Sequence, residues 1–319
     1  MDSGRTGLRQ NGRMPDLLDK RLLFVTGKGG VGKSTVAIAL GLAAAERGKR
    51  TIVCEVASQE HASRVFRRSE VGFHEVEMAD GLWTISIDPD RSLREYLTIQ
   101  APVRAMGEML SRSRVFTYLT TATPGLKELV TIGKIWELAQ LDRRVKKARK
   151  YDLVVVDAPA TGAGIGFLQT PRTFARIARV GPIRSQAEAL DRYVTDHERT
   201  GAAIVALPEE MPVNESEMLE RELSDHLGVA VDRVYMNCMY PDRFSDADAK
   251  RLEGIADSVR ASARAAVRAA LSERQRARAH RAQLGRLERL VQAPVHPLPY
   301  IFEPEVGVAE IERLAGEVA

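Results

Sequence analysis

Short apolar runs recur along the chain between segments of helical or turn-like composition. Most of them are continuously hydrophobic and only four to eight residues long, which is typical of strands buried on both faces of a parallel sheet. The predicted strands are residues 22–25, 51–54, 81–89, 151–157, 201–208, 231–237 and 291–296. The run at 81–89 alternates in hydrophobicity and stops at Pro89, so we predict an edge-like strand.

Segments with helical patterns separate these strands. Residues 36–45 are apolar and lack proline, and residues 126–141 carry Leu or Ile at every third position after Thr123-Pro124-Gly125. This alternation predicts an α/β fold class, with a mainly parallel sheet flanked by helices.

We predict a flexible N-terminal lead over 1–18 and a single domain over 19–319. Within that domain we expect an inserted helical subdomain at about 92–149 and further helices at about 163–200, 214–227 and 245–290, with a closing helix to Ala319. Four apolar residues of the segment 163–200 are expected in the core: Phe167, Leu168, Phe174 and Ile177.

The composition narrows the class of protein. With 319 residues, of which 44% are hydrophobic and 28% charged, the chain is an ordinary globular protein. Cys54 and Cys238 lie far apart in apolar runs, which excludes a disulfide framework and a Cys-x-x-Cys zinc site. Since no apolar run approaches the ~20 residues of a membrane span and the N-terminus carries charges, we expect a cytoplasmic protein without a transmembrane segment. The net charge of +4 permits contact with nucleic acid or anionic membranes without requiring it.

A glycine-rich segment between the first strand and the first helix carries the clearest chemistry. Glycines let a loop wrap an anion, and backbone N–H groups together with a helix N-terminus attract phosphate. In such a loop a lysine reaches the β- and γ-phosphates, and the serine that follows it ligates Mg²⁺. The segment is Gly27-Lys28-Gly29-Gly30-Val31-Gly32-Lys33-Ser34-Thr35. It predicts a P-loop NTPase, with Lys33 and Ser34 in these two roles; the alternative is a glycine-rich turn that matches by chance.

Lys28 narrows this match, because an ordinary P-loop needs no lysine at that position. A second cation beside the loop would crowd Lys33 unless it points elsewhere. The pattern Lys-Gly-Gly-x-x-Gly-Lys-Ser resembles the deviant Walker A motif of the MinD/ParA/ArsA ATPases, in which this lysine contacts the nucleotide held by the facing subunit. The resemblance implies a dimer in which Lys28 acts in trans. A solvated loop lysine is the alternative interpretation.

The run at 151–157 ends in Asp157. Ligands of open α/β sheets bind at the carboxyl ends of the strands, so we interpret Asp157 as the Walker B acid that holds a Mg²⁺-bound water. Residues 158–162 would then be the switch loop that senses the γ-phosphate. A carboxylate that only caps the next helix is the alternative.

Three other features are less specific. Asn237 ends the run at 231–237, and its amide suits either an adenine edge or a turn. The loop 297–306 is a candidate to pack around a base. Arginines four residues apart form one helical stripe, which suits an anionic partner or a solvated face: Arg260, Arg264 and Arg268.

These motifs together resemble the ArsA-type ATPases, which include the arsenite-pump ATPase subunit and the ATPase that targets tail-anchored membrane proteins. The resemblance spans most of the chain, and residues 157–171 follow the family's switch segment in order and spacing. It implies ATP and Mg²⁺ as cofactors, contact of Glu209 with the nucleotide and recognition of adenine by Asn237. It also implies a dimer; we expect a homodimer and keep a heterodimer with a paralogue as the alternative.

The chain departs from the family at the switch I motif Asp-Pro-Ala-His. Ala57 stands where the family has the acid that orients the attacking water, so we expect sound ATP binding but slow hydrolysis. Glu55 and Glu60 are the nearby substitutes, and we take Glu55 as the candidate catalytic acid; a structural carboxylate is the alternative. Ala163 and Gly166 also replace a His and an Arg of the family, and no cysteine cluster matches its zinc or arsenite sites.

Two functions follow from these observations. The leading hypothesis is a Mg²⁺-ATP-driven dimer with Lys28, Lys33 and Glu55 as catalytic residues, whose inserted helices open or close an apolar surface for membrane-protein clients. The alternative is a ParA/MinD-like ATPase that positions cargo on DNA or a membrane surface. The helical insertion and Asn237 argue against this alternative, so we do not expect nucleic acid as a partner. A small-molecule kinase would need an acceptor site that we cannot locate.

Overall fold

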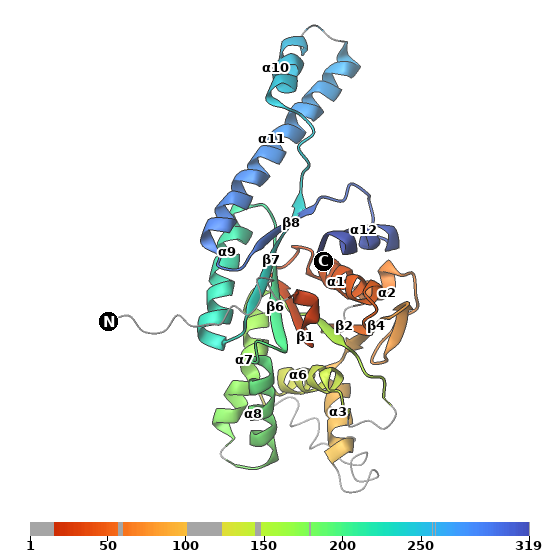
Figure 1. Ribbon diagram of the computed structural model, residues 1–319, viewed down its shortest axis with the longest axis vertical. Coiled ribbons are helices and arrows are strands. Elements are labelled where there is room, and N and C mark those ends of the chain that lie inside the picture. Colours follow the sequence, from red (N-terminus) through yellow and green to blue (C-terminus); the bar gives the residue numbers. More distant parts are fainter. Residues whose placement is uncertain are drawn as a thin grey trace, which may run out of the picture.

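The computed structural model describes residues 16–56, 60–100, 123–143, 148–178, 180–256, 258 and 260–318. These residues form a central sheet with helices on both of its faces (Figure 1). A long helical hairpin, made of α10 and α11, extends away from the sheet at the top of the view.

The sheet has eight strands in the described part of the chain, in the order β3-β4-β2-β5-β1-β6-β7-β8. All neighbouring strands run parallel except β3 and β4. The strands are β1 Leu22–Gly27, β2 Thr51–Val56, β3 Val76–Ala79, β4 Leu82–Ile87, β5 Leu153–Asp157, β6 Thr200–Ala206, β7 Val231–Met239 and β8 Val295–Pro299. Because β1 lies between β5 and β6, the P-loop and the end of β5 meet at one edge of the sheet.

Most of the helices connect successive strands. They are α1 Lys33–Glu46, α2 His61–Val65, α3 Pro89–Gln100, α6 Leu126–Ala139, α7 Thr161–Ile177, α8 Pro182–Val194, α9 Glu210–Arg221, α10 Asp246–Ile255, α11 Ala261–Leu290 and α12 Val308–Val318. A 3₁₀ turn, η1 Leu17–Asp19, precedes β1, and a π-helical turn, η2 Glu222–Leu227, extends α9.

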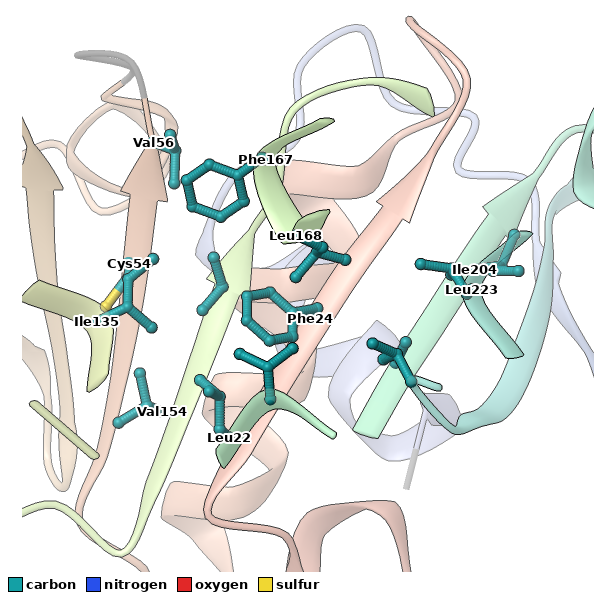
Figure 2. Close-up of a cluster of buried hydrophobic side chains, with 14 of the residues drawn as sticks. Leu22, Phe24, Cys54, Val56, Ile135, Val154, Phe167, Leu168, Ile204 and Leu223 are labelled. Atoms are coloured by element: carbon teal, nitrogen blue, oxygen red, sulfur yellow. The ribbon is translucent and has the colours of Figure 1, made fainter. Parts of the chain in front are cut away.

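The central strands are buried on both faces, as their apolar runs predicted. Every residue of β1, β2, β4, β5 and β6 is buried. Alternate side chains enter two cores: one is covered by α1 and α12, and the other by α6, α7, α8, α9 and α11. Figure 2 shows part of the second core, in which Phe24 lies close to Leu168 of α7 and Cys54 lies close to Ile135 of α6.

The predicted fold class is confirmed. The sheet is mainly parallel, and α3 and α6 are inserted between β4 and β5. α6 begins at Leu126, directly after Thr123-Pro124-Gly125, and its periodic residues Ile132, Ile135 and Leu138 are buried. Residues 101–122 of the predicted insertion lie outside the described residues.

Several predicted boundaries need correction. β4 is not an edge strand, because the four-residue strand β3 pairs with its outer side; so short a strand gave no recognisable pattern. The predicted helix 245–290 consists of two helices, α10 and α11. Leu17 and Leu18, which the sequence placed in the flexible lead, are buried in the core below α1. The rest of that lead, residues 1–15, lies outside the described residues.

Candidate functional site

The P-loop joins the last residue of β1, Gly27, to the first residue of α1, Lys33. Gly30 and Gly32 have φ angles of 81° and 92°, a region that side chains disfavour. Apart from the glycine itself and its two neighbours in the chain, no atom of the described residues lies within 4 Å of where a Cβ would stand at Gly29 or Gly30. The loop therefore presents open backbone at the N-terminus of α1, which is the arrangement that binds phosphate.

Both lysines of the loop have partners within the chain. Lys33 Nζ donates a hydrogen bond to the backbone oxygen of Lys28 at 3.0 Å. Lys28 Nζ pairs with Glu215 Oε1 of α9 at 2.7 Å. Burial lowers the pKa of Lys33, and the negative charge of Asp157 opposes that shift. Because Lys28 reaches α9, the two cations do not compete for the same space.

Ser34 and Asp157 meet, although they are 123 residues apart in the sequence. β5 pairs with β1 so that Asp157 lies opposite Val25, two residues before the P-loop. Ser34 Oγ donates to Asp157 Oδ2 at 2.5 Å. Burial raises the pKa of Asp157, whereas the hydrogen bond from Ser34 and the charge of Lys33 lower it.

This pair fits the predicted Mg²⁺ site. Hydroxyl and carboxylate oxygens are ligands that Mg²⁺ accepts in nucleotide sites. A cation beside Asp157 would also offset the cost of burying a carboxylate whose pKa is raised by desolvation. Thr35 follows Ser34 in the first turn of α1 and is half-buried.

Glu55 lies beside Asp157 on the neighbouring strand β2. Both side chains point to the face that α1 covers, since the residues two positions earlier on β2 and β5 belong to that core. Glu55 Oε1 accepts hydrogen bonds from the backbone N–H groups of His61 at 2.6 Å and Ala62 at 3.1 Å, where α2 begins. Glu55 Oε2 is buried and has no hydrogen-bond partner among the described residues. Burial raises the pKa of Glu55 to about 7, although the two amides oppose the shift.

Glu60, the other acid considered in place of the switch I Asp, holds a loop through hydrogen bonds to its backbone. Its carboxylate accepts the backbone N–H groups of Val71 at 3.1 Å and Gly72 at 2.9 Å. Ala57 lies outside the described residues. Of the two acids, Glu55 is therefore the one that the structure brings to the Ser34–Asp157 pair.

Asn237 braces the P-loop, a role that its sequence context did not reveal. Its Nδ2 donates to the backbone oxygen of Val31 at 2.9 Å, and its Oδ1 accepts the N–H of Cys238 at 2.9 Å. A Cβ at Gly32 would come within 2.4 Å of Nδ2, so the loop and the amide are in direct contact. One N–H and one lone pair of the amide remain for a further partner, and that this partner is an adenine remains a prediction. Glu209 is exposed at the N-terminus of α9, where its side chain makes no capping hydrogen bond.

Aromatic rings gather on the loops that follow β7 and β8. Tyr300 stands 4.8 Å from Tyr240 and 4.9 Å from Phe302 between ring centroids, and the guanidinium of Arg243 lies 4.7 Å from the ring centre of Phe302. Such rings are suited to stacking on a base. The predicted loop 297–306 begins only after Pro299, because residues 297–299 belong to β8. That this loop packs around a base remains a prediction.

The switch loop leads directly into α7. Three residues, 158–160, separate Asp157 from Thr161, the first residue of α7. The helix has 17 residues, which corresponds to a length of about 25 Å. Phe167 and Leu168 lie in the core as predicted, but Ile177 near the far end is exposed and Phe174 lines a cavity. The core prediction was wrong for these two residues because the far end of α7 extends beyond the sheet.

This cavity has a volume of about 310 Å³ and lies between α3, α6, α7 and α8; we call it the apolar cleft. Its apolar lining residues are Leu93, Leu97, Leu126, Leu129, Val130, Trp136, Phe174, Ile183, Ala187 and Leu190. The period-three leucines of α6 were a signal for one wall. The contribution of α8 had no comparable signal, because polar residues are interspersed among its apolar ones.

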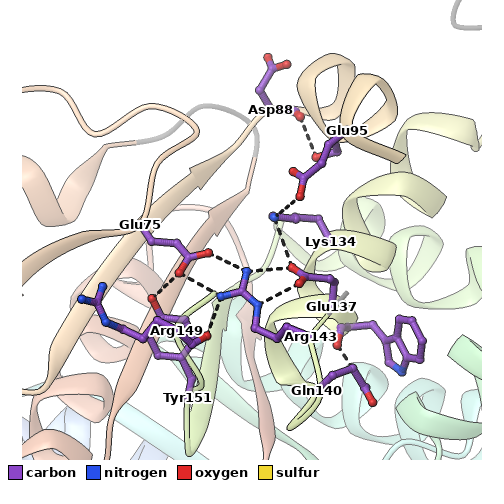
Figure 3. Close-up of polar contacts among 11 residues, drawn as sticks. Glu75, Asp88, Glu95, Lys134, Glu137, Gln140, Arg143, Arg149 and Tyr151 are labelled. Carbon is purple, nitrogen blue, oxygen red and sulfur yellow. Dashed lines mark hydrogen bonds and ion pairs between the residues drawn. The ribbon is translucent and has the colours of Figure 1, made fainter. Parts of the chain in front are cut away.

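Buried ion pairs fix one wall of the apolar cleft to the sheet (Figure 3). Arg143 bonds Glu137 of α6 at 2.9 Å and Glu75, which precedes β3, at 2.7 Å. The Tyr151 hydroxyl at the start of β5 donates to Glu75 at 2.7 Å. Lys134 links α6 to Glu95 of α3 at 2.8 Å. The network connects the helices of the cleft to the strand that ends in Asp157.

The fold and the site define a P-loop NTPase with a second lysine in its phosphate loop. The family of anion-transporting ATPases, or ArsA ATPases, matches the chain over residues 20–186 and 176–261. The chain belongs to this family, and it is an ATP-hydrolysing enzyme.

Named relatives agree with this assignment. The chain is 32% identical to ATPase BagA of Mycobacterium tuberculosis over 250 residues, which cover 76% of this chain and 72% of that protein. It is 28% identical to ATPase get3 of Neurospora crassa over 180 residues, which cover 54% of this chain and 50% of that protein. It is 23% identical to ATPase GET3 of Kluyveromyces lactis over 262 residues, which cover 72% and 74% of the two chains. In the part of the chain that the structure describes, every helix is too short or too polar to span a membrane.

Proposed function

We propose that this ATPase is a cytoplasmic, Mg²⁺-ATP-driven dimeric switch that binds and releases apolar segments of membrane-protein clients. The observation that carries this proposal is the path of α7. The helix starts at the switch loop behind Asp157 and ends at the apolar cleft. A displacement of the switch loop would therefore be transmitted along one continuous helix to the surface that holds the client.

The nucleotide would bind along the P-loop. Residues 29–35 and the Lys33 ammonium hold the phosphates, and Ser34 and Asp157 hold Mg²⁺. When bound, Mg²⁺ neutralises charge on the phosphates. Lys33 has to exchange its hydrogen bond with the Lys28 carbonyl for the phosphates, which is an exchange that a flexible side chain makes readily. Asn237 and Glu209 contact the nucleoside.

Glu55 is the proposed acid for the attacking water. Its Oε2 is available, it adjoins Asp157, and its pKa near 7 suits a general base at neutral pH. Because Oε1 is bonded to the start of α2, the carboxylate has little freedom to adjust. Catalytic geometry tolerates small displacements poorly, so we propose that the isolated chain hydrolyses ATP slowly and that a paralogous partner could supply a better placed acid.

The client would bind in the apolar cleft. Ile177, Val180 and Ile183 lie at the junction of α7 and α8 and are exposed, and Ile183 also lines the cleft. Monomeric soluble proteins rarely leave such apolar surface uncovered unless it binds something. Apolar side chains in a row, as in a membrane-protein segment, fit this lining.

The arginine stripe gives little support to the alternative function, an ATPase that positions cargo on DNA or a membrane surface. Arg260 and Arg268 are exposed, but Arg264 donates to the backbone oxygen of Ala256 at 3.1 Å. Further along α11, Arg281 is paired with Asp242 at 2.6 Å. Much of the positive charge of the hairpin is therefore satisfied within the chain, and we do not propose DNA or a membrane surface as the partner.

ATP-dependent association tests the dimeric switch. Wild type and Lys28→Ala are compared for ATP binding, for molecular mass by sedimentation with and without Mg²⁺-ATP, and for phosphate release. We expect Lys28→Ala to bind ATP with nearly wild-type affinity but neither to dimerise nor to turn over. A Lys28→Ala protein that dimerises on ATP like the wild type would contradict the proposal.

A further inference from the structure

We propose that Glu215 is a positioning residue that restrains Lys28 and thereby sets the ATP concentration at which two subunits associate. The inference rests on the proposed action of Lys28 across the dimer. Glu215 lies outside the P-loop motif, on the helix that begins directly after Glu209.

The geometry places Glu215 where it can control Lys28. β6 pairs in parallel with β1, and α9 follows β6, so α9 begins beside the P-loop. Lys28 Nζ and Glu215 Oε1 are 2.7 Å apart, and each side chain is about one third exposed, at 33% and 34%. The pair is formed, but it remains accessible to a competing group.

The same face of α9 has the character of an interface. Met211 and Met218 lie four residues before and three residues after Glu215, so the three side chains share one side of the helix. The two methionines are 63% and 68% exposed. Methionine is enriched where proteins meet, and two methionines flanking an ion pair form a surface that a facing subunit would cover. The occupant that we infer is a second copy of this chain, because the nucleotide that Lys28 reaches belongs to the facing subunit.

Electrostatics gives Glu215 its effect. A carboxylate at 2.7 Å neutralises the Lys28 ammonium and repels any phosphate that approaches it. Lys33 donates a hydrogen bond to the backbone oxygen of Lys28, so each cation of the loop has a partner within the chain. Phosphate binding has to release the hydrogen bond of Lys33, and association has to release the pair of Lys28 with Glu215. An ion pair as exposed as this one changes an equilibrium by about two- to fivefold.

The test measures the ATP concentration that gives half-maximal association, by sedimentation or light scattering. The variants are Glu215→Gln, the control Glu217→Gln, Lys28→Met and the double variant Lys28→Met/Glu215→Gln. Glu217 is on the same helix but pairs with Arg221 at 2.7 Å, so its substitution removes the same charge without touching the P-loop. Thermal unfolding of each variant checks that the fold is intact.

We expect Glu215→Gln to lower the ATP concentration required by about two- to fivefold and Glu217→Gln to leave it unchanged. The double variant should fail to associate, as Lys28→Met does. Three results would overturn the inference: an unchanged or raised ATP requirement in Glu215→Gln, an equal decrease in Glu217→Gln, or association restored in the double variant. If Lys28→Met itself associates like the wild type, the action of Lys28 in trans is refuted as well, which separates failure of the proposed function from failure of the inference alone.

Discussion

The P-loop and the Ser34–Asp157 pair, which we call the nucleotide edge, lie at one end of α7, and the apolar cleft lies at the other end. The two regions use their charges in opposite ways. At the nucleotide edge, Lys28 and Lys33 hold partners that a phosphate can replace, and the pair of Lys28 with Glu215 is one third exposed. Behind the cleft, the Arg143 side chain is only 2% exposed. Water therefore has little access to the Arg143 guanidinium that bonds Glu75 and Glu137. The first region is built to exchange contacts and the second to hold a wall in place. A nucleotide-driven switch requires both kinds of region. A movement at the P-loop can change the cleft only if the elements between them keep their structure.

The largest expected effect lies at the exchanging end. Lys33→Ala removes the side-chain cation that we propose for the β- and γ-phosphates, and we expect ATP binding to be lost, with affinity falling by about 100-fold or more. Titration calorimetry measures it. Unchanged affinity for ATP would contradict the assignment of the P-loop itself. Lys28→Ala serves as the matched control, because it removes a cation from the same loop and should preserve binding.

The second prediction tests the fixed wall. Arg143→Met removes the guanidinium that bridges Glu75 and Glu137 and leaves them only Tyr151 and Lys134 as partners, so we expect a loss of about 3 kcal/mol in the free energy of unfolding. Urea denaturation measures this change. Arg221→Met removes an exposed ion pair and should cost less than about 1 kcal/mol. Similar losses in the two variants would show that the wall does not depend on the buried network.

The third prediction concerns Glu55 and pH. If Glu55 acts as a base, turnover rises as the pH increases through about 7, the pKa to which burial raises this carboxyl. Glu55→Gln should lower turnover about 100-fold and abolish that rise. Phosphate release at a series of pH values gives both results. Turnover that survives Glu55→Gln would leave Glu55 as only the anchor of α2.

Stability should respond to the same group in the opposite direction. The folded-state pKa of Glu55 is about 7 and the reference value is 4.5, so the protonated form favours folding. This contribution is complete below 4.5 and is lost as the pH rises to about 7. Glu55→Gln should remove that part of the pH dependence in urea denaturation. An identical pH profile in wild type and variant would contradict the raised pKa.

The smallest effect is expected at the surface of the cleft. Ile183→Asp places a charge on an exposed residue of the lining, so the fold should persist while affinity for an apolar probe falls about tenfold. Fluorescence of a hydrophobic dye or a labelled apolar peptide reports the change. Leu141→Asp is the control, since Leu141 is also exposed but does not line the cleft. Equal losses in the two variants would mean that the cleft is not the binding surface.

The sequence predicted the nucleotide edge better than the cleft for a physical reason. The phosphate loop is formed by consecutive residues, and Asp157 joins it because the carboxyl ends of adjacent parallel strands meet at one edge. The pairing of Lys28 with Glu215 and the brace from Asn237 to Val31 join residues 187 and 206 positions apart, and their local context gives no sign of either contact. The cleft depends on four helices that pack side by side. Of these helices, only α6 had an apolar face that the sequence predicted, through its regularly spaced leucines.

Coupling between the two ends of α7 can be measured through the affinity of the apolar cleft for a labelled apolar peptide. The peptide is titrated with and without Mg²⁺-ATP, into wild type and into Lys33→Ala. We predict that ATP changes the affinity of the wild type by at least about fivefold and leaves that of Lys33→Ala unchanged. The same peptide affinity in wild type with and without ATP, under conditions in which ATP is bound, would contradict the account.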